Sequence, residues 1–191
     1  MKVVAFNGSA RKDGNTAILL NIVLDELRSE GIETDLVHLA GKSLRGCIAC
    51  YRCFNNKDRK CAVGEDSANE CIARMAEADG ILLGSPTYFA DLSAGIKALI
   101  ERSGMVARAN GDMFKRKVGA GVVAVRRAGA IHVFSSLNYF FLIGQMIVPG
   151  SSYWNMAIGR EPGDVMKDTE GVRTMKDLGQ NMAWLLKKLN A

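Results

Sequence analysis

Residues 2–16 read KVVAFNGSARKDGNT and join a short apolar run to a polar loop that contains two glycines. Apolar residues then recur at spacings of three and four positions, at Ile18, Leu19, Ile22, Val23 and Leu27. This order predicts a strand at 2–6, a loop, and a helix that ends near Gly31.

The same alternation continues along the chain. Strands are expected at Thr34–Leu39, Gly80–Gly84, Val118–Val125 and Gln145–Val148, and helices at Asp66–Ala78, Ser93–Ser103, Ser135–Ile143 and Thr169–Leu189. Continuous apolar strands separated by helices are typical of a parallel sheet that is covered on both faces. The chain therefore predicts an α/β fold, a doubly wound five-stranded parallel sheet with helices on both faces, whose ligand site lies in the loops after the first, third and fourth strands.

Length and composition indicate one compact domain over residues 1–191. Of the 191 residues, 48% are hydrophobic and 24% are charged, which is typical of a globular protein. No apolar run approaches the roughly 20 residues of a membrane span, and the N-terminus lacks the pattern of a signal peptide, so we expect a cytoplasmic protein with no membrane partner.

The net charge of +5 is concentrated in one segment. Six cations and a single acid lie between positions 42 and 60, namely Lys42, Arg45, Arg52, Lys57, Arg59 and Lys60 against Asp58. Neither interleaved aromatic residues nor a recognition-helix pattern accompanies these cations, so nucleic acid is not expected as a partner. The positive electrostatic field of this segment suits an anionic cofactor or an acidic partner better.

The loop between the first strand and helix has the chemistry of a phosphate site. Backbone N–H groups and the helix dipole converge there on an anion. The candidate binding residues share small size, hydrogen-bonding capacity or positive charge: Ser9, Arg11, Gly14, Asn15 and Thr16. The loop lacks both the G-x-G-x-x-G fingerprint and the lysine of a Walker A loop, which disfavours nucleoside triphosphate hydrolysis. The alternative is a polar turn that binds nothing.

A family resemblance appears when this loop is taken together with Gly84-Ser85-Pro86-Thr87-Tyr88-Phe89 after the third strand. The two motifs resemble those of the NADPH-dependent FMN reductases and the iron–sulfur flavoproteins, which have a flavodoxin-like fold. The resemblance runs from Lys2 to about Arg102. It implies that FMN binds with its phosphate on the first loop and its ring against Pro86, Thr87, Tyr88 and Phe89, with NAD(P)H as the electron donor.

The residue types of the second motif suit a flavin ring, which needs apolar or aromatic walls and backbone donors. The alternative for Tyr88 and Phe89 is ordinary core filling at the end of a strand.

After the fourth strand, Arg126, Arg127 and Gly129 lie where the resemblance places the pyrimidine edge of the flavin, although relatives have more glycines there. Either arginine could stabilise a reduced anionic flavin or accept the 2′-phosphate of NADPH; the alternative is a solvated pair of arginines. His132 is a candidate proton donor, or a structural histidine.

Four of the five cysteines, Cys47, Cys50, Cys53 and Cys61, lie within fifteen residues, in a loop insertion at about 41–66. This close spacing suits an iron–sulfur cluster and resembles the compact motif of the iron–sulfur flavoproteins, so a [4Fe–4S] cluster is a candidate cofactor. Two alternatives are a four-cysteine zinc site and a reduced loop without a cofactor. Structural disulfides are not expected. Cys71 is expected to be a buried apolar residue.

Three functions remain open at this stage. The first is an NAD(P)H-dependent FMN reductase-like enzyme that reduces a flavin, a quinone or a similar acceptor. The second is an iron–sulfur flavoprotein that carries electrons between protein partners, and the third is an interaction module held together by a metal. The apolar segment 131–148 further predicts a homodimer or homotetramer.

Overall fold

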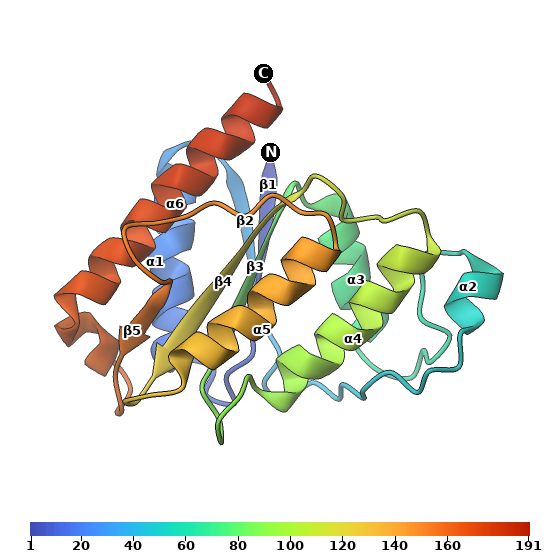
Figure 1. The fold of residues 1–191 in the computed structure, drawn as a ribbon, viewed down its shortest axis with the longest axis horizontal. Coiled ribbons are helices and arrows are strands. Elements are labelled where there is room, and N and C mark those ends of the chain that lie inside the picture. The colour runs from blue at the N-terminus through green and yellow to red at the C-terminus, as the bar shows by residue number, and fades with distance from the viewer.

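The computed structural model describes residues 1–191, and its centre is a five-stranded parallel sheet with the strand order β2-β1-β3-β4-β5 (Figure 1). The strands are β1 (Lys2–Asn7), β2 (Glu33–His38), β3 (Gly80–Pro86), β4 (Val118–Val125) and β5 (Met156–Ile158). The helices are α1 (Asn15–Ser29), α2 (Arg52–Asn56), α3 (Ala68–Glu77), α4 (Ala94–Ala109), α5 (Ala130–Ile143) and α6 (Thr169–Leu189), with a short 3-10 helix at Asp164–Lys167. The predicted flavodoxin-like α/β architecture is confirmed.

Helices cover both faces of the sheet because alternate residues of each strand point to opposite sides. In β1, Val4 and Phe6 pack in the cluster formed with α3, α4 and α5, whereas Val3 and Ala5 pack in the cluster formed with α1 and α6. Figure 1 shows α5 in front of the sheet, and α1 and α6 pack together on its opposite face. The central strands β3 and β4 are buried along their whole lengths, as their continuous apolar sequences require.

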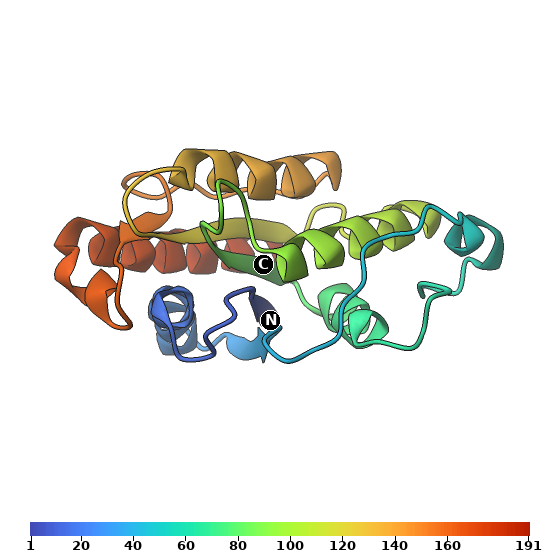
Figure 2. The ribbon, with the colours of Figure 1, turned by 90° about the horizontal axis from the view of Figure 1, so that it is seen from below.

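All five strands end at the same edge of the sheet, which faces the viewer in Figure 2. The loops after β1, β3 and β4 therefore come together there, although they are far apart in the sequence. Those loops carry the predicted cofactor residues, so this edge is the place to look for a site.

The fifth strand lies at Met156–Ile158, and its prediction at Gln145–Val148 was wrong. Ile147 does reach the sheet, but it makes only an isolated bridge to Val118 at the start of β4. Pro149 follows, and since proline has no N–H to donate, the chain leaves the edge of the sheet there. It returns to pair with the other end of β4, where Met156 lies opposite Val123.

Helix α5 begins at Ala130, five residues before the expected start. Its N-cap is Gly129, in the left-handed region with φ of 89°, and no side chain caps the first turn. The usual sequence signal for a helix start is therefore missing.

The cysteine-rich segment lies at one end of the molecule, beyond α3 and α4 (Figures 1 and 2). Apart from the single short helix α2, it has no regular structure. Four non-glycine residues in it have positive φ: Ala49, Tyr51, Lys57 and Arg59. Such conformations persist only where the surrounding contacts determine them, so this loop has a specific shape.

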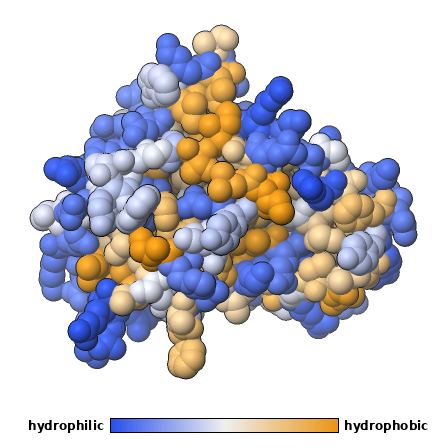
Figure 3. Space-filling view, in the orientation of Figure 1, coloured by the Kyte–Doolittle hydropathy of each residue, from blue (hydrophilic) through white to orange (hydrophobic).

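The front face of the molecule carries a band of hydrophobic side chains over α5 (Figure 3). Val133, Leu137 and Phe141 point into the core, whereas Leu142 and Ile143 are 62% and 69% exposed. No helix is both long and apolar enough to cross a membrane.

Candidate functional site

The loop between β1 and α1 is shaped by the buried side chain of Asn7. Its Oδ1 accepts a hydrogen bond from the Ser9 N–H at 3.0 Å, and its Nδ2 donates to the Lys12 carbonyl at 3.2 Å. Ser9 Oγ in turn accepts from the Arg11 N–H at 3.1 Å. Three hydrogen bonds thus hold the loop before any ligand binds.

Helix α1 opens on this loop without a capping side chain, because its N-cap residue is Gly14. The first N–H groups of a helix have no partner within the helix, and a glycine N-cap leaves them open to an external acceptor. The positive end of the helix dipole lies at the same place. This end of α1 therefore suits a phosphate group.

Gly8 allows the loop to approach α4 closely. Its N–H donates to the Gly84 carbonyl at 2.8 Å, and a Cβ at this position would lie 2.1 Å from Cγ1 of Ile96. Any larger residue at position 8 would therefore push the loop away from α4.

The Asn15 side chain is engaged within the protein. Its Oδ1 accepts from the Gly163 N–H at 2.8 Å, and its Nδ2 donates to the Glu161 carbonyl at 3.0 Å. Through these bonds Asn15 ties the segment after β5 to the start of α1, and its contact with a ligand stays a prediction.

The second wall of the site follows β3. The Thr87 N–H donates to the Ala124 carbonyl at 3.0 Å, while Thr87 Oγ1 is buried without a hydrogen-bond partner. Tyr88 reaches the first loop, where its hydroxyl lies 3.4 Å from Ser9 Oγ. A buried hydroxyl with no partner needs an explanation, and a ligand that fills the adjoining cavity supplies one.

Phe89 lies at the tip of a tight turn, and its side chain is fully exposed. The turn is closed by paired hydrogen bonds between Tyr88 and Asp91, and both central residues have positive φ, 41° for Phe89 and 80° for Ala90. Asp91 also lies 3.4 Å from His132 Nε2, so this histidine has an acidic partner at the start of α5. Phe89 is therefore not part of the wall formed by Tyr88.

These loops enclose a cavity of about 230 Å³. It is lined by Ser9, Arg11, Asn15, Thr16, Pro86, Thr87, Tyr88, Ala124, Arg126, Gly159 and Arg160. Eight of the twelve predicted cofactor residues are in this set; Gly14, Phe89, Arg127 and Gly129 are not. Gly129 still adjoins the site, because a Cβ there would lie 3.1 Å from Thr87 Cγ2.

Three lining residues were missed from the sequence: Ala124, Gly159 and Arg160. Gly159 and Arg160 follow β5 directly, so placing that strand at 145–148 hid them. A correct assignment of β5 would have found them, because they occupy the loop after a strand, as Arg126 does after β4.

The cavity is strongly positive. Arg11, Arg126 and Arg160 surround it, and only Arg160 has an ion pair within the chain, to Glu161 at 3.2 Å. Two unpaired guanidinium groups and an uncapped helix N-terminus can together bind a doubly charged phosphate by charge-assisted hydrogen bonds.

A second site lies at the other end of the molecule, where Cys47, Cys50, Cys53 and Cys61 line one small cavity. All four thiols are free of disulfide bonds. Burial raises the pKa of Cys53, whereas hydrogen bonds from the backbone and side chain of Arg52 lower the pKa of the exposed Cys50. Cys71 is buried separately in α3, as predicted.

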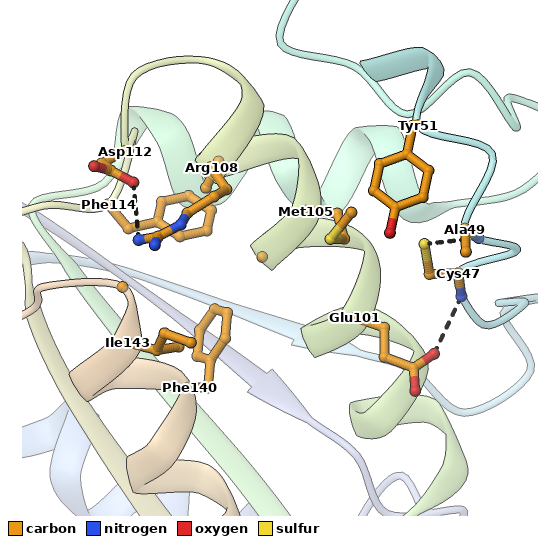
Figure 4. Close-up of a pocket in the computed structure, with 13 residues that line it drawn as sticks. Cys47, Ala49, Tyr51, Glu101, Met105, Arg108, Asp112, Phe114, Phe140 and Ile143 are labelled. Atoms are coloured by element: carbon orange, nitrogen blue, oxygen red, sulfur yellow. Dashed lines mark hydrogen bonds and ion pairs between the residues drawn. The ribbon is translucent and has the colours of Figure 1, made fainter. Parts of the chain in front are cut away.

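Three neighbouring residues of helix α4 form hydrogen bonds with three of these cysteines. Glu101 Oε2 accepts from the Cys47 N–H at 3.1 Å (Figure 4), and Arg102 Nε donates to Cys61 Sγ at 3.3 Å. One turn further on, the carbonyl of Met105 lies 3.9 Å from Cys53 Sγ. Cys50 makes no hydrogen bond to α4.

The four thiols match the ligand number of an iron–sulfur cluster. No three cysteine, histidine or acidic side chains converge closely enough to hold a metal ion. The space between the cysteines is about 20 Å³, roughly one water molecule.

A further cavity of about 480 Å³ adjoins the cysteine loop between α4 and α5 (Figure 4). Its walls include Tyr51, Phe114 and Phe140, and Arg108 forms an ion pair with Asp112 at 3.5 Å at its rim. It lies apart from the helix N-terminus and cations of the first site.

A family model and two relatives match most of this chain. A family model described as NADPH-dependent FMN reductase matches residues 1–161. An iron–sulfur flavoprotein of Methanocaldococcus jannaschii is 38% identical over 98% of each chain. An iron–sulfur flavoprotein of Methanosarcina thermophila is 30% identical over 97% of this chain and 95% of its own.

Solved structures support the fold. RosB with a bound riboflavin-5′-phosphate intermediate superposes with a TM-score of 0.76 at 17% identity, over 100% of this chain and 80% of RosB. A flavodoxin from the domain Archaea superposes with a TM-score of 0.63 at 16% identity, over 98% and 99% of the two chains. At these identities, the likeness concerns the fold alone.

Proposed function

Because this chain belongs to the family of NADPH-dependent FMN reductases, we propose that it is an FMN-dependent oxidoreductase that uses NAD(P)H to reduce a flavin, a quinone or a similar acceptor. The observation that carries the proposal is the positive cavity at the carboxyl edge of the sheet, where Arg11, Arg126 and the start of α1 meet. When bound, FMN supplies the redox chemistry, taking up a hydride from NAD(P)H and passing two electrons to the acceptor.

The protein's own residues bind and orient the flavin. Arg11, Ser9 and Thr16, with the N–H groups of the first turn of α1, would hold the phosphate. The cavity of about 230 Å³ is smaller than the ~300–1,000 Å³ of a site for a whole small molecule, so it would hold the phosphate end of FMN, and the wall formed by Thr87 and Tyr88 would support the ring. Thr87 Oγ1, which is buried and unpaired, would gain a hydrogen-bond partner.

The arginine beyond β4 has a separate role. Arg126 lines the cavity, and a positive group beside the pyrimidine edge stabilises the negative charge that reduction places there. Arg127, which does not line the cavity, is left for the 2′-phosphate of NADPH or for solvent.

Anaerobic reduction tests this proposal. Protein loaded with FMN is mixed with NADPH or NADH, and loss of the visible flavin absorbance is followed. Rapid loss with either nucleotide supports the enzyme. Stable absorbance with both, in protein that demonstrably holds FMN, would contradict it.

A second candidate function is an electron carrier that contains both FMN and a [4Fe–4S] cluster. It is favoured by the four cysteines around one cavity and by their anchoring on α4. The thiolates of Cys47, Cys50, Cys53 and Cys61 would hold the cluster, which supplies one-electron transfer. The six surrounding cations suit an acidic partner protein.

Iron analysis tests this candidate. Protein prepared under argon is expected to carry about four irons and four sulfides per chain, the content of a single [4Fe–4S] cluster. Serine replacement at each of the four clustered positions should abolish the cluster, and Cys71→Ser should not. Protein without iron, or equal loss from Cys71→Ser, would contradict the assignment.

A further inference from the structure

Arg102 is the largest side chain that the fold buries completely. It is 1% exposed, and its guanidinium group donates to four partners, all of them in the segment 45–66. These are Cys61 Sγ at 3.3 Å, the carbonyl of Arg45 at 3.4 Å, the carbonyl of Val63 and the carboxylate of Asp66.

A buried ion pair needs a reason. Asp66 is 4% exposed and balances the charge of Arg102, and its own pKa is below its usual value because hydrogen bonds from the Arg45 and Ala68 N–H groups and from Arg102 outweigh the effect of burial. Taking two charges out of water costs several kcal/mol per ion, and apolar residues of similar volume often stabilise a core as well or better. Stability alone is therefore a poor explanation for this pair.

The position of Arg102 offers another explanation. It holds the last cysteine of the cluster, while its neighbour Glu101 holds the backbone of the first, Cys47. Two neighbouring residues of α4 therefore contact the first and the last of the four cysteines, so α4 fixes the positions of both ends of the cysteine loop. Outer hydrogen bonds of this kind orient metal ligands and tune the metal.

We propose that Arg102 is a positioning residue for an iron–sulfur cluster: it fixes Cys61 and the loop around it, and its charge raises the reduction potential of the cluster. The inference rests on the proposed cluster site. A cluster bound by four thiolates is negatively charged and becomes more so on reduction. A hydrogen bond to a ligand sulfur and a buried cation both favour the more negative, reduced form.

Three variants prepared under argon separate the effect of the charge of Arg102 from the effect of its hydrogen-bonding geometry. Arg102→Gln removes the positive charge, and Arg102→Lys keeps the charge but lacks the planar guanidinium group. Arg108→Gln is the matched control, because Arg108 lies on the same helix but is 55% exposed and pairs only with Asp112. Iron retention against a chelator and the reduction potential from an EPR-monitored titration are measured, with circular dichroism as the check on folding.

We expect Arg102→Gln to hold iron about 10- to 100-fold more weakly than the wild type, which is the usual effect of losing an outer partner of a metal ligand. Its remaining cluster should have a lower potential. Arg102→Lys should also lose iron faster but keep a potential nearer that of the wild type. Arg108→Gln should match the wild type in both measurements.

The outcomes distinguish this inference from the proposed cluster. Wild-type protein without iron would remove the cluster itself, and the inference with it. A loaded wild type whose folded Arg102 variants keep the same iron affinity and the same potential would overturn the inference and leave the cluster standing. If Arg102→Gln does not fold, Arg102→Lys decides, and unchanged iron retention and potential in that variant overturn the proposal.

Discussion

The side-chain oxygen of Asn15 accepts a hydrogen bond from the N–H of Gly163 at 2.8 Å, across 148 positions of the chain. With the bond from Asn15 Nδ2 to the Glu161 carbonyl, it fastens the segment after β5 to the phosphate loop. Arg160, one of the three cations around the cavity, belongs to that segment.

Asn15→Ala should therefore weaken FMN binding indirectly. Removing two hydrogen bonds frees the segment that carries Arg160, and we expect a loss of about 1–2 kcal/mol in binding free energy. Flavin titration monitored by fluorescence measures it. Equal affinity in the wild type and Asn15→Ala would contradict this role.

Arg11→Ala should weaken FMN binding directly, by about 1–3 kcal/mol, because a charge-assisted contact to the phosphate is lost. The wild type should also lose affinity with rising salt more steeply than the variant does. Lys12→Ala is the control, since Lys12 is an exposed cation of the same loop that does not line the cavity. Unchanged affinity in Arg11→Ala would place the phosphate elsewhere.

Cys71 should make the stability of the metal-free protein depend on pH above 9. Burial raises the pKa of its thiol to about 11 from an ordinary value of 9.0. The unfolded chain therefore ionises first, so the contribution is fully present below about pH 9 and is lost as the pH rises toward 11. Cys71→Ala should lose less stability than the wild type over this interval, by about 2–3 kcal/mol at most.

Urea unfolding at a series of pH values under reducing conditions measures this difference. Cys50→Ala is the control, because Cys50 is exposed and its pKa is lowered rather than raised. Parallel stability curves for the wild type and Cys71→Ala would show that the thiol is not buried in solution.

Self-association through α5 remains a prediction, and the exposed apolar side chains of that helix define how to test it. Leu142 and Ile143 are large apolar side chains exposed on α5, and their replacement together by glutamate should convert a dimer or tetramer into monomers. Light scattering measures the mass. Met166→Glu, at a methionine that is 52% exposed in the 3-10 helix, should keep the wild-type mass. A wild-type monomer at micromolar concentration would contradict the prediction.

Local patterns predicted most of the sheet and both candidate sites. Strands β1, β3 and β4 are recognisable because a strand buried on both faces must be apolar throughout. Strand β5 has only three residues, which is too short for a clear sequence pattern. It pairs with the unpaired edge of β4, and the local sequence does not indicate where along β4 this pairing occurs. The misplaced strand also explains why Gly159 and Arg160 were missed.

Within the sites too, the sequence indicated the residue types, and the tertiary structure decided where their side chains lie. Phe89 has the composition of a flavin wall, yet the turn at 88–91 points it into solvent. Arg102 looks like an ordinary surface arginine on an amphipathic helix, and only the cysteine segment folding over α4 buries it beside Asp66.

By itself, the sequence determined the α/β fold, the candidate phosphate loop and the four candidate cluster ligands, because each depends on residues that are close together in the chain. Tertiary structure alone decided which side chains those elements bring together: Asn15 with Gly163, Arg160 with Arg11 around one cavity, and Arg102 with Cys61. Periodicity reports which face of a helix or strand is apolar. It does not report which distant segment will cover that face, because the packing of the whole chain selects that contact.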